Sequence, residues 1–102
     1  MQSDKVYRML GLATRAGKVV CGEGAVSDSI RSGKAKLVIV AGDASGNTEK
    51  KFKNSCEYYS VDSITADDRF VLGNAVGRSF AVILAVCDES FAKVIKESAQ
   101  KQ

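Results

Sequence analysis

Two closely spaced glycines, Gly22 and Gly24, follow a short apolar segment and precede a helical pattern. Glycine permits a tight turn and lets another molecule approach the backbone closely. The helix that follows would present unpaired N–H groups and the positive end of its dipole. Such a helix start commonly binds an anion, most often a phosphate. The sequence therefore predicts a backbone site for a phosphate at residues 22–25.

This turn does not match the common nucleotide-binding motifs. Gly22 and Gly24 fit the first two positions of the dinucleotide motif G-x-G-x-x-G, but Ser27 occupies its third position. The chain of 102 residues is also short for a fold that binds both halves of a dinucleotide. No glycine precedes a Lys-Ser or Lys-Thr pair at the Walker A spacing. A small phosphate or nucleotide ligand remains as an alternative use of the turn.

Residue types suited to catalysis are sparse. The chain has no histidine, which is the commonest general base and metal ligand. Asp43 and Asp88 follow apolar strands, where α/β enzymes gather catalytic groups, but a loop turn and a helix cap explain them better. The three cysteines are widely spaced and form no CxxC pair, so we predict structural thiols, no metal site and no disulfide framework. We therefore expect neither an enzyme nor a cofactor.

Length, composition and charge bound the class of protein. With 102 residues, 45% of them hydrophobic, we expect one domain over residues 1–102 with a modest core. No stretch approaches the about 18 uninterrupted apolar residues of a membrane span, and no signal peptide is indicated. Reduced cysteines then favour a cytoplasmic protein. The net charge is only +3, but cations gather in residues 1–36 and are absent from residues 57–68, which suggests one surface that faces a polyanion.

Hydrophobic spacing predicts helices that alternate with short apolar strands. We expect helices over residues 4–16, 23–32, about 45–56, about 67–77 and from 88 onward, and strands over 18–21, 37–41, 58–61 and 81–86. Gly17 and Gly33 each stand between a helix and a strand and predict left-handed helix ends. Helices on both faces of a four-stranded mixed sheet would give a three-layer α/β/α sandwich with about five helices.

Two helix starts carry capping signals. Ser45 or Asn47 is expected to begin the third helix. Residues 65–68 resemble a capping box, with an acid three residues after the threonine, and would open the fourth helix. That helix is expected to carry Phe70, Val71 and Val76 and to end at Gly77.

Four segments, residues 12–23, 35–45, 47–51 and 72–77, and the strand after the last of them resemble one known family at consistent spacings. The family is the kink-turn-binding ribosomal-protein superfamily (the L-seven-Ae and L-thirty-e class), and the chain is most similar to its bacterial YlxQ-type branch. The resemblance covers about residues 5–95. It implies RNA binding without catalysis, because the family holds a sharply bent RNA whose bend carries tandem sheared G·A pairs. The implied grip uses the loop and start of the second helix, backed by the loop before the last strand.

The resemblance also implies a helix start that reads Gly-x-Asn-Glu-x-x-Lys, of which this chain keeps only the glycine. Gly24, Ala25 and Asp28 stand in place of the Asn, the Glu and the Lys. Loss of the Lys would weaken binding to any RNA, and loss of base-edge contacts would reduce specificity. Ser45 stands where the family often has a Glu that faces a flipped-out base. Selectivity would then depend on shape, on residues 76–80 and on nearby cations.

The implied RNA-binding set combines the helix start, the loop before the last strand and cations at its rim. Phe80 is suited to stacking on an unpaired base, and a core position at the strand start is the alternative. Lys34 and Lys36 are left out because they lie at the far end of the second helix, about 15 Å away. The set is Lys18, Gly22, Glu23, Gly24, Ala25, Ser27, Asp28, Asp43, Ser45, Lys50, Lys51, Val76, Gly77, Arg78, Ser79 and Phe80.

These features together predict a cytoplasmic, monomeric protein that recognises kink-turn-like structured RNA, in ribosomal RNA or elsewhere, without membrane contact. The first alternative is a protein of the same fold that has lost kink-turn recognition and acts through protein contacts or weak RNA binding on the ribosome. The second alternative is a small phosphate or nucleotide binder that uses the same glycine turn.

Overall fold

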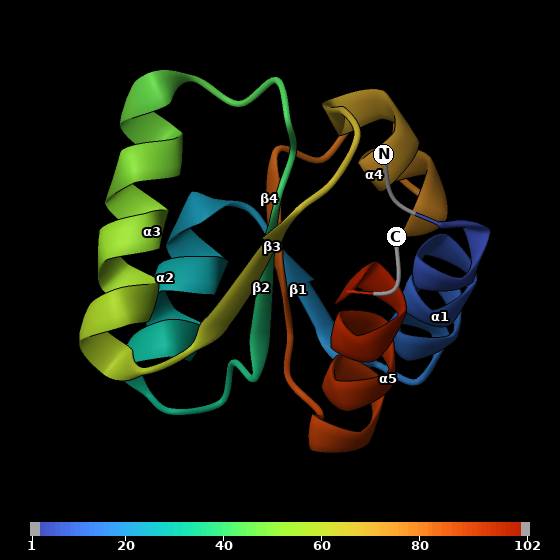
Figure 1. Ribbon diagram of the computed structural model, residues 1–102, viewed down its shortest axis with the longest axis horizontal. Coiled ribbons are helices and arrows are strands. Elements are labelled where there is room, and N and C mark those ends of the chain that lie inside the picture. The colour runs from blue at the N-terminus through green and yellow to red at the C-terminus, as the bar shows by residue number, and fades with distance from the viewer. Residues whose placement is uncertain (1–2, 101–102) are drawn as a thin grey trace.

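The computed structural model describes residues 3–100. Its elements are α1 (Asp4–Arg15), β1 (Val19–Cys21), α2 (Glu23–Arg31), β2 (Leu37–Val40), α3 (Gly46–Tyr59), β3 (Asp62–Thr65), α4 (Arg69–Ala75), β4 (Ile83–Val86) and α5 (Glu89–Gln100). Figure 1 shows α2 and α3 on one face of the sheet and α1, α4 and α5 on the other. The predicted three-layer α/β/α sandwich is therefore confirmed. None of the helices in this part of the chain is long and apolar enough to cross a membrane.

The sheet has the strand order β1-β4-β2-β3. β4 runs antiparallel to both β1 and β2, whereas β2 and β3 are parallel. The sheet is therefore mixed, as predicted. Every residue of the two central strands, β2 and β4, is buried. A strand covered by helices on both faces needs such a continuous apolar run.

Alternate residues of the central strands divide the core into two halves. Leu37 and Ile39 of β2 pack with α1, α4 and α5, whereas Val38 and Val40 pack with α2 and α3. This division follows the two-residue period of a β-strand. The inward residues predicted for the second and third helices are all at most 2% exposed: Val26, Ile30, Phe52 and Cys56.

The predicted ends of several helices are also confirmed. Gly17 and Gly33 have φ of 72° and 78°, a conformation that favours glycine, and they follow α1 and α2. Ser45 caps α3, because its Oγ accepts a hydrogen bond from the Thr48 N–H at 3.2 Å. Asp88 caps α5 through the N–H of Phe91, which donates to Asp88 Oδ2 at 2.9 Å.

The strand predicted at residues 58–61 is wrong. α3 continues to Tyr59, and Ser60 ends it in the left-handed conformation with φ of 58°. β3 begins only at Asp62. Aromatic and β-branched residues favour strands because they fit a half-buried pleated surface. Tyr58 is 81% exposed and has no such surface to fit, so its residue type was misleading.

The predicted start of the fourth helix is also wrong. Thr65 is the last residue of β3, and Asp68 caps α4 by accepting hydrogen bonds from the N–H groups of Phe70 and Val71 at 2.8 Å each. Phe70 is 62% exposed and Val71 is 39% exposed. The short helix instead turns Leu72 toward the core, where that side chain is fully buried.

Candidate functional site

A cavity of about 570 Å³ lies where the turn between β1 and α2 meets the loop between α4 and β4. We call the side formed by residues 21–23 the α2 wall and the side formed by residues 77–83 the loop wall. The Gly22 N–H donates a hydrogen bond to the Ile83 carbonyl at 3.1 Å and so joins the two walls. The structure thus brings together the two segments that the resemblance assigned to one grip.

The α2 wall presents backbone groups. Gly22 is the N-cap of α2 with φ of 95°, and no side chain of residues 3–100 caps this helix start. The first backbone hydrogen bond of the helix runs from the Val26 N–H to the Gly22 carbonyl. The N–H groups of the first turn therefore face outward beside the cavity, together with the positive end of the helix dipole.

The loop wall is held tightly against α4. The Arg78 N–H donates to the Gly73 carbonyl, and the Ala81 N–H donates to the Arg69 carbonyl, both at 2.9 Å. A Cβ on Gly73 would lie 2.4 Å from the Phe80 Cα, so only glycine permits this approach. Phe80 itself is 57% exposed. The alternative of a core position for Phe80 is therefore wrong, and its ring is accessible at the cavity.

Arg78 supplies positive charge to the cavity. Its side chain forms no ion pair with any acidic side chain in the described part of the chain. Burial raises the pKa of the neighbouring Cys21 thiol, and the positive charge of Arg78 opposes part of that rise. Cys21 therefore remains a neutral thiol, and the guanidinium is the charged side chain of the loop wall.

Glu23 fastens the α2 wall to the start of α3. The Thr48 hydroxyl donates to Glu23 Oε2 at 3.5 Å, and the Lys51 Nζ lies 3.6 Å from Glu23 Oε1. The Ser45 hydroxyl joins this group through Thr48 Oγ1 at 3.0 Å. Three predicted site residues, Glu23, Ser45 and Lys51, therefore hold the starts of α2 and α3 together, and Glu23 offsets the charge of Lys51.

The other predicted residues of α2 and α4 lie outside the cavity lining. Gly24 and Ala25 are exposed in the first turn of α2, and Ser27 is half-buried. Asp28 forms an ion pair with Arg31 one turn further along α2. Its negative charge is thus offset within the helix. Val76 is 7% exposed and belongs to the core at the end of α4.

Asp43 connects the loop after β2 to the start of α4. Its Oδ1 accepts a hydrogen bond from the Arg69 N–H at 3.0 Å, and its Oδ2 accepts one from Arg69 Nε at 3.1 Å. Desolvation opposes ionisation of the carboxyl, but the hydrogen bonds and charge of Arg69 outweigh it and hold the Asp43 pKa below its usual value. Asp43 therefore acts as a brace between two segments.

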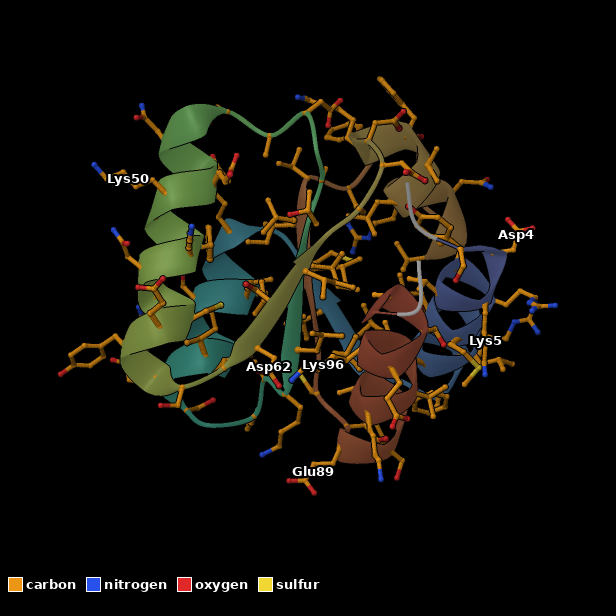
Figure 2. All side chains as sticks on the ribbon, in the orientation of Figure 1. Asp4, Lys5, Lys50, Asp62, Glu89 and Lys96 are labelled. Atoms are coloured by element: carbon orange, nitrogen blue, oxygen red, sulfur yellow. The ribbon has the colours of Figure 1, made fainter. Side chains whose placement is uncertain are left out.

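Two predicted cations lie away from the cavity. Lys18 stands at the opposite end of β1 from Gly22, and its carbonyl accepts a hydrogen bond from the Cys87 N–H at 2.7 Å. The cavity, in contrast, lies beside the start of β4. Lys50 projects outward from α3, on the side away from α2 (Figure 2).

Residues 4–96 match the ribosomal protein L7Ae/L30e/S12e/Gadd45 family. The chain belongs to this family. It is 46% identical to the RNA-binding protein YlxQ of Bacillus subtilis, over 90% of this chain and 92% of that protein. It is 34% identical to the large ribosomal subunit protein eL30 of Neurospora crassa, over 96% of this chain and 92% of that protein. A solved structure of a protein of unknown function from Bacillus halodurans matches with a TM-score of 0.93 and 31% identity, over 96% and 99% of the two chains.

These findings confirm the predicted superfamily and its YlxQ-type branch.

In this L7Ae/L30e-type chain, four residues that the sequence did not place in the site also line the cavity: Cys21, Ala81, Val82 and Ile83. We predicted Cys21 to be structural and residues 81–86 to be a buried strand. Cys21 and residues 81–83 meet at the cavity because β1 pairs with β4, with Cys21 opposite Leu84. Strand pairing of this kind has no local signal in the sequence.

Proposed function

We propose that this chain is a non-catalytic RNA-binding protein that recognises kink-turn-like structured RNA at the cavity between the α2 wall and the loop wall. One observation carries the proposal: a helix start without a side-chain cap, Arg78 and the exposed Phe80 converge on a single cavity. Backbone N–H groups and arginine suit phosphates, and an exposed aromatic ring suits an unstacked base. Relatives named as an RNA-binding protein and a ribosomal protein support the same conclusion.

A bent RNA fits this arrangement better than a straight duplex. A kink brings phosphates and a splayed base close together, whereas a regular duplex keeps its bases stacked. A protein that binds the bent form more tightly shifts the RNA toward that form. Gly24 and Ala25 offer no side-chain group that reads a base edge, so recognition would depend on RNA shape and on Phe80.

We further propose that the chain acts in the cytoplasm as a single, monomeric domain, in association with the ribosome or its RNA. The family match and the eL30 relative support this setting.

The test is the affinity for a kink-turn RNA compared with a straight duplex of equal length and composition, at low and moderate salt. We expect tighter binding to the kink-turn RNA at both salt concentrations, accompanied by bending in a fluorescence energy-transfer assay. Equal affinity for the two RNAs would contradict kink-turn recognition. Binding to neither RNA would contradict the RNA-binding proposal as a whole.

A small nucleotide is a second candidate ligand because the cavity volume of about 570 Å³ is typical of small-molecule sites. Thermal unfolding in the presence of mononucleotides tests this alternative. A rise in the unfolding temperature with a nucleotide, without tighter binding to kink-turn RNA, would favour it.

A further inference from the structure

Two exposed tyrosines lie at the end of α3, away from the cavity. Tyr58 is 81% exposed and Tyr59 is 42% exposed. Their rings meet edge to face with centroids 4.9 Å apart. α3 is anchored in the core by Phe52 and Cys56. The tyrosine pair therefore leaves aromatic surface accessible that the core does not use.

A hollow of about 260 Å³ adjoins this pair, between the segment that follows α2 and the segment that follows α3. Arg31, Gly33 and Lys36 are on one side of the hollow, and Tyr59 and Ser60 are on the other. Figure 1 shows that α2 and α3 both end at the lower edge of the view. The cavity, in contrast, is lined by residues at the start of α2. The hollow is therefore a separate surface on the same helical layer.

Cations gather at one side of the hollow, where Arg31 and Lys36 line it and Lys34 follows Gly33 of the lining in the chain. Lys34 is exposed and forms no ion pair with an acidic side chain among residues 3–100. Lys36 donates a hydrogen bond to the Gly33 carbonyl at 3.1 Å and lies 4.0 Å from Glu89. Asp62, an acid in the lining, is bound by Lys96 at 2.8 Å (Figure 2). Arg31, Lys36 and Asp62 of the lining each have an oppositely charged neighbour. The surface thus combines an aromatic ring with Lys34 as the cation that has no acidic partner among the described residues.

We infer that this hollow binds a single-stranded segment of the RNA whose bent part occupies the cavity, with a base stacked on Tyr59 and phosphates beside Lys34 and Lys36. Aromatic stacking combined with cations along the backbone is the usual way in which proteins hold single strands. The nine residues of α2 separate the two surfaces. They span about 14 Å, so one RNA can reach both. This inference rests on the proposed function, because the single strand belongs to the same RNA that the cavity binds.

The test compares a kink-turn RNA with the same RNA carrying a single-stranded oligouridine extension. We expect the extension to improve wild-type affinity about tenfold, the gain expected from one stacked base. Tyr59→Leu and Lys34→Ala should each remove most of this gain and leave the affinity for the unextended RNA unchanged. Tyr59→Phe should keep the gain because it keeps the ring. Lys5→Ala is the matched charge control, since Lys5 is exposed on α1 in the other helical layer (Figure 2).

Three outcomes would overturn the inference. If the extension gives wild type no gain, or if the gain survives both Tyr59→Leu and Lys34→Ala, the hollow does not hold the strand, although the cavity still binds RNA. If the protein binds neither RNA, the proposed function fails as well. Should Tyr59→Leu fail to fold in a thermal-unfolding check, Lys34→Ala decides, because Lys34 lies in an exposed loop.

Discussion

The two walls of the cavity present different chemical groups. The α2 wall offers main-chain N–H groups, and Glu23 of this wall is turned toward Thr48 and Lys51. The loop wall offers two side chains, Arg78 and Phe80, on a backbone fixed against α4. Main-chain groups bind any phosphate alike, whereas positioned side chains discriminate among ligands. We therefore assign general affinity to the α2 wall and to Arg78, and selectivity to Phe80 of the loop wall.

The largest expected effect is on the stability of the loop wall. In Gly73→Ala the new methyl group would lie 2.4 Å from the Phe80 Cα and 2.6 Å from its carbonyl carbon, and backbone cannot rotate away as a side chain can. Overpacking of this kind costs about 1–3 kcal/mol, and we expect the upper end of that range in urea unfolding.

Gly24→Ala, in the first turn of α2, is the matched control. A Cβ on Gly24 would meet no other group within 4 Å, so we expect a gain of about 0.5 kcal/mol from better helix propensity. Equal stability of Gly73→Ala and wild type would contradict the fixed position of the loop.

The second largest effect is expected on the affinity for RNA. Phe80→Ala should weaken binding to kink-turn RNA by about 1–3 kcal/mol, the usual contribution of a stacked base. Stability should change by less than about 0.5 kcal/mol, as for most exposed positions. Phe70→Ala is the control, because Phe70 is similarly exposed (62% against 57%) and lies outside the cavity lining. If both variants lose the same affinity, the loop wall has no special part in binding.

A smaller effect is expected at a tether behind the loop wall. The Tyr7 hydroxyl donates to Asp67 Oδ2 at 2.9 Å and accepts from the Asp67 N–H at 3.1 Å, which ties α1 to the segment that leads into α4. Tyr7→Phe should lower the free energy of unfolding by about 1 kcal/mol, the usual net contribution of a hydrogen bond.

The same tether predicts a dependence on alkaline pH. Desolvation, together with the nearby carboxylates, raises the pKa of Tyr7 from 10.0 to about 12. A raised pKa in the folded state means that the stabilisation is complete below the unfolded value and is lost as the pH rises through the folded value. The stability difference between wild type and Tyr7→Phe should therefore shrink between pH 10 and about 12 in urea unfolding. A difference that stays constant over this range would contradict the tether.

The smallest effect is expected at the brace between Asp43 and Arg69, whose side chains are 39% and 36% exposed to solvent. The Asp43 pKa is lowered in the folded state, so its stabilisation is present above the unfolded value of 3.8 and is lost as the pH falls below it. Asp43→Asn should be slightly less stable than wild type at neutral pH, and the difference should fade with acid and with added salt. A difference that grows on acidification would reverse the assigned sign.

The sequence predicted well those parts of the fold that depend on local chemistry. Gly17 and Gly33 end helices because few other residues adopt their backbone conformation. The apolar runs in β2 and β4 are long enough to indicate strands covered on both faces. The end of α3 was missed because Tyr58 and Tyr59 favour strands by residue type, while their helical conformation depends on how the rest of α3 packs.

The candidate site was predictable only in part, because contacts between distant parts of the chain leave no local signal in the sequence. The turn at Gly22 has a local signal, and the family resemblance added the loop at residues 76–80, of which residues 77–80 line the cavity. The lining contributed by Cys21 and Val82 depends on the pairing of β1 with β4, which brings distant parts of the chain together. Lys18 appeared near the turn in sequence, but the intervening strand carries it to the opposite end of the sheet.

The two walls are expected to bind one RNA together. An amide NMR titration of the isotope-labelled protein with unextended kink-turn RNA tests this. We expect the largest shifts at residues 22–25 and 77–80 at the same RNA concentration, with little change at Tyr58 and Tyr59. Shifts confined to one wall, or largest at other surfaces while both walls stay unchanged, would contradict it.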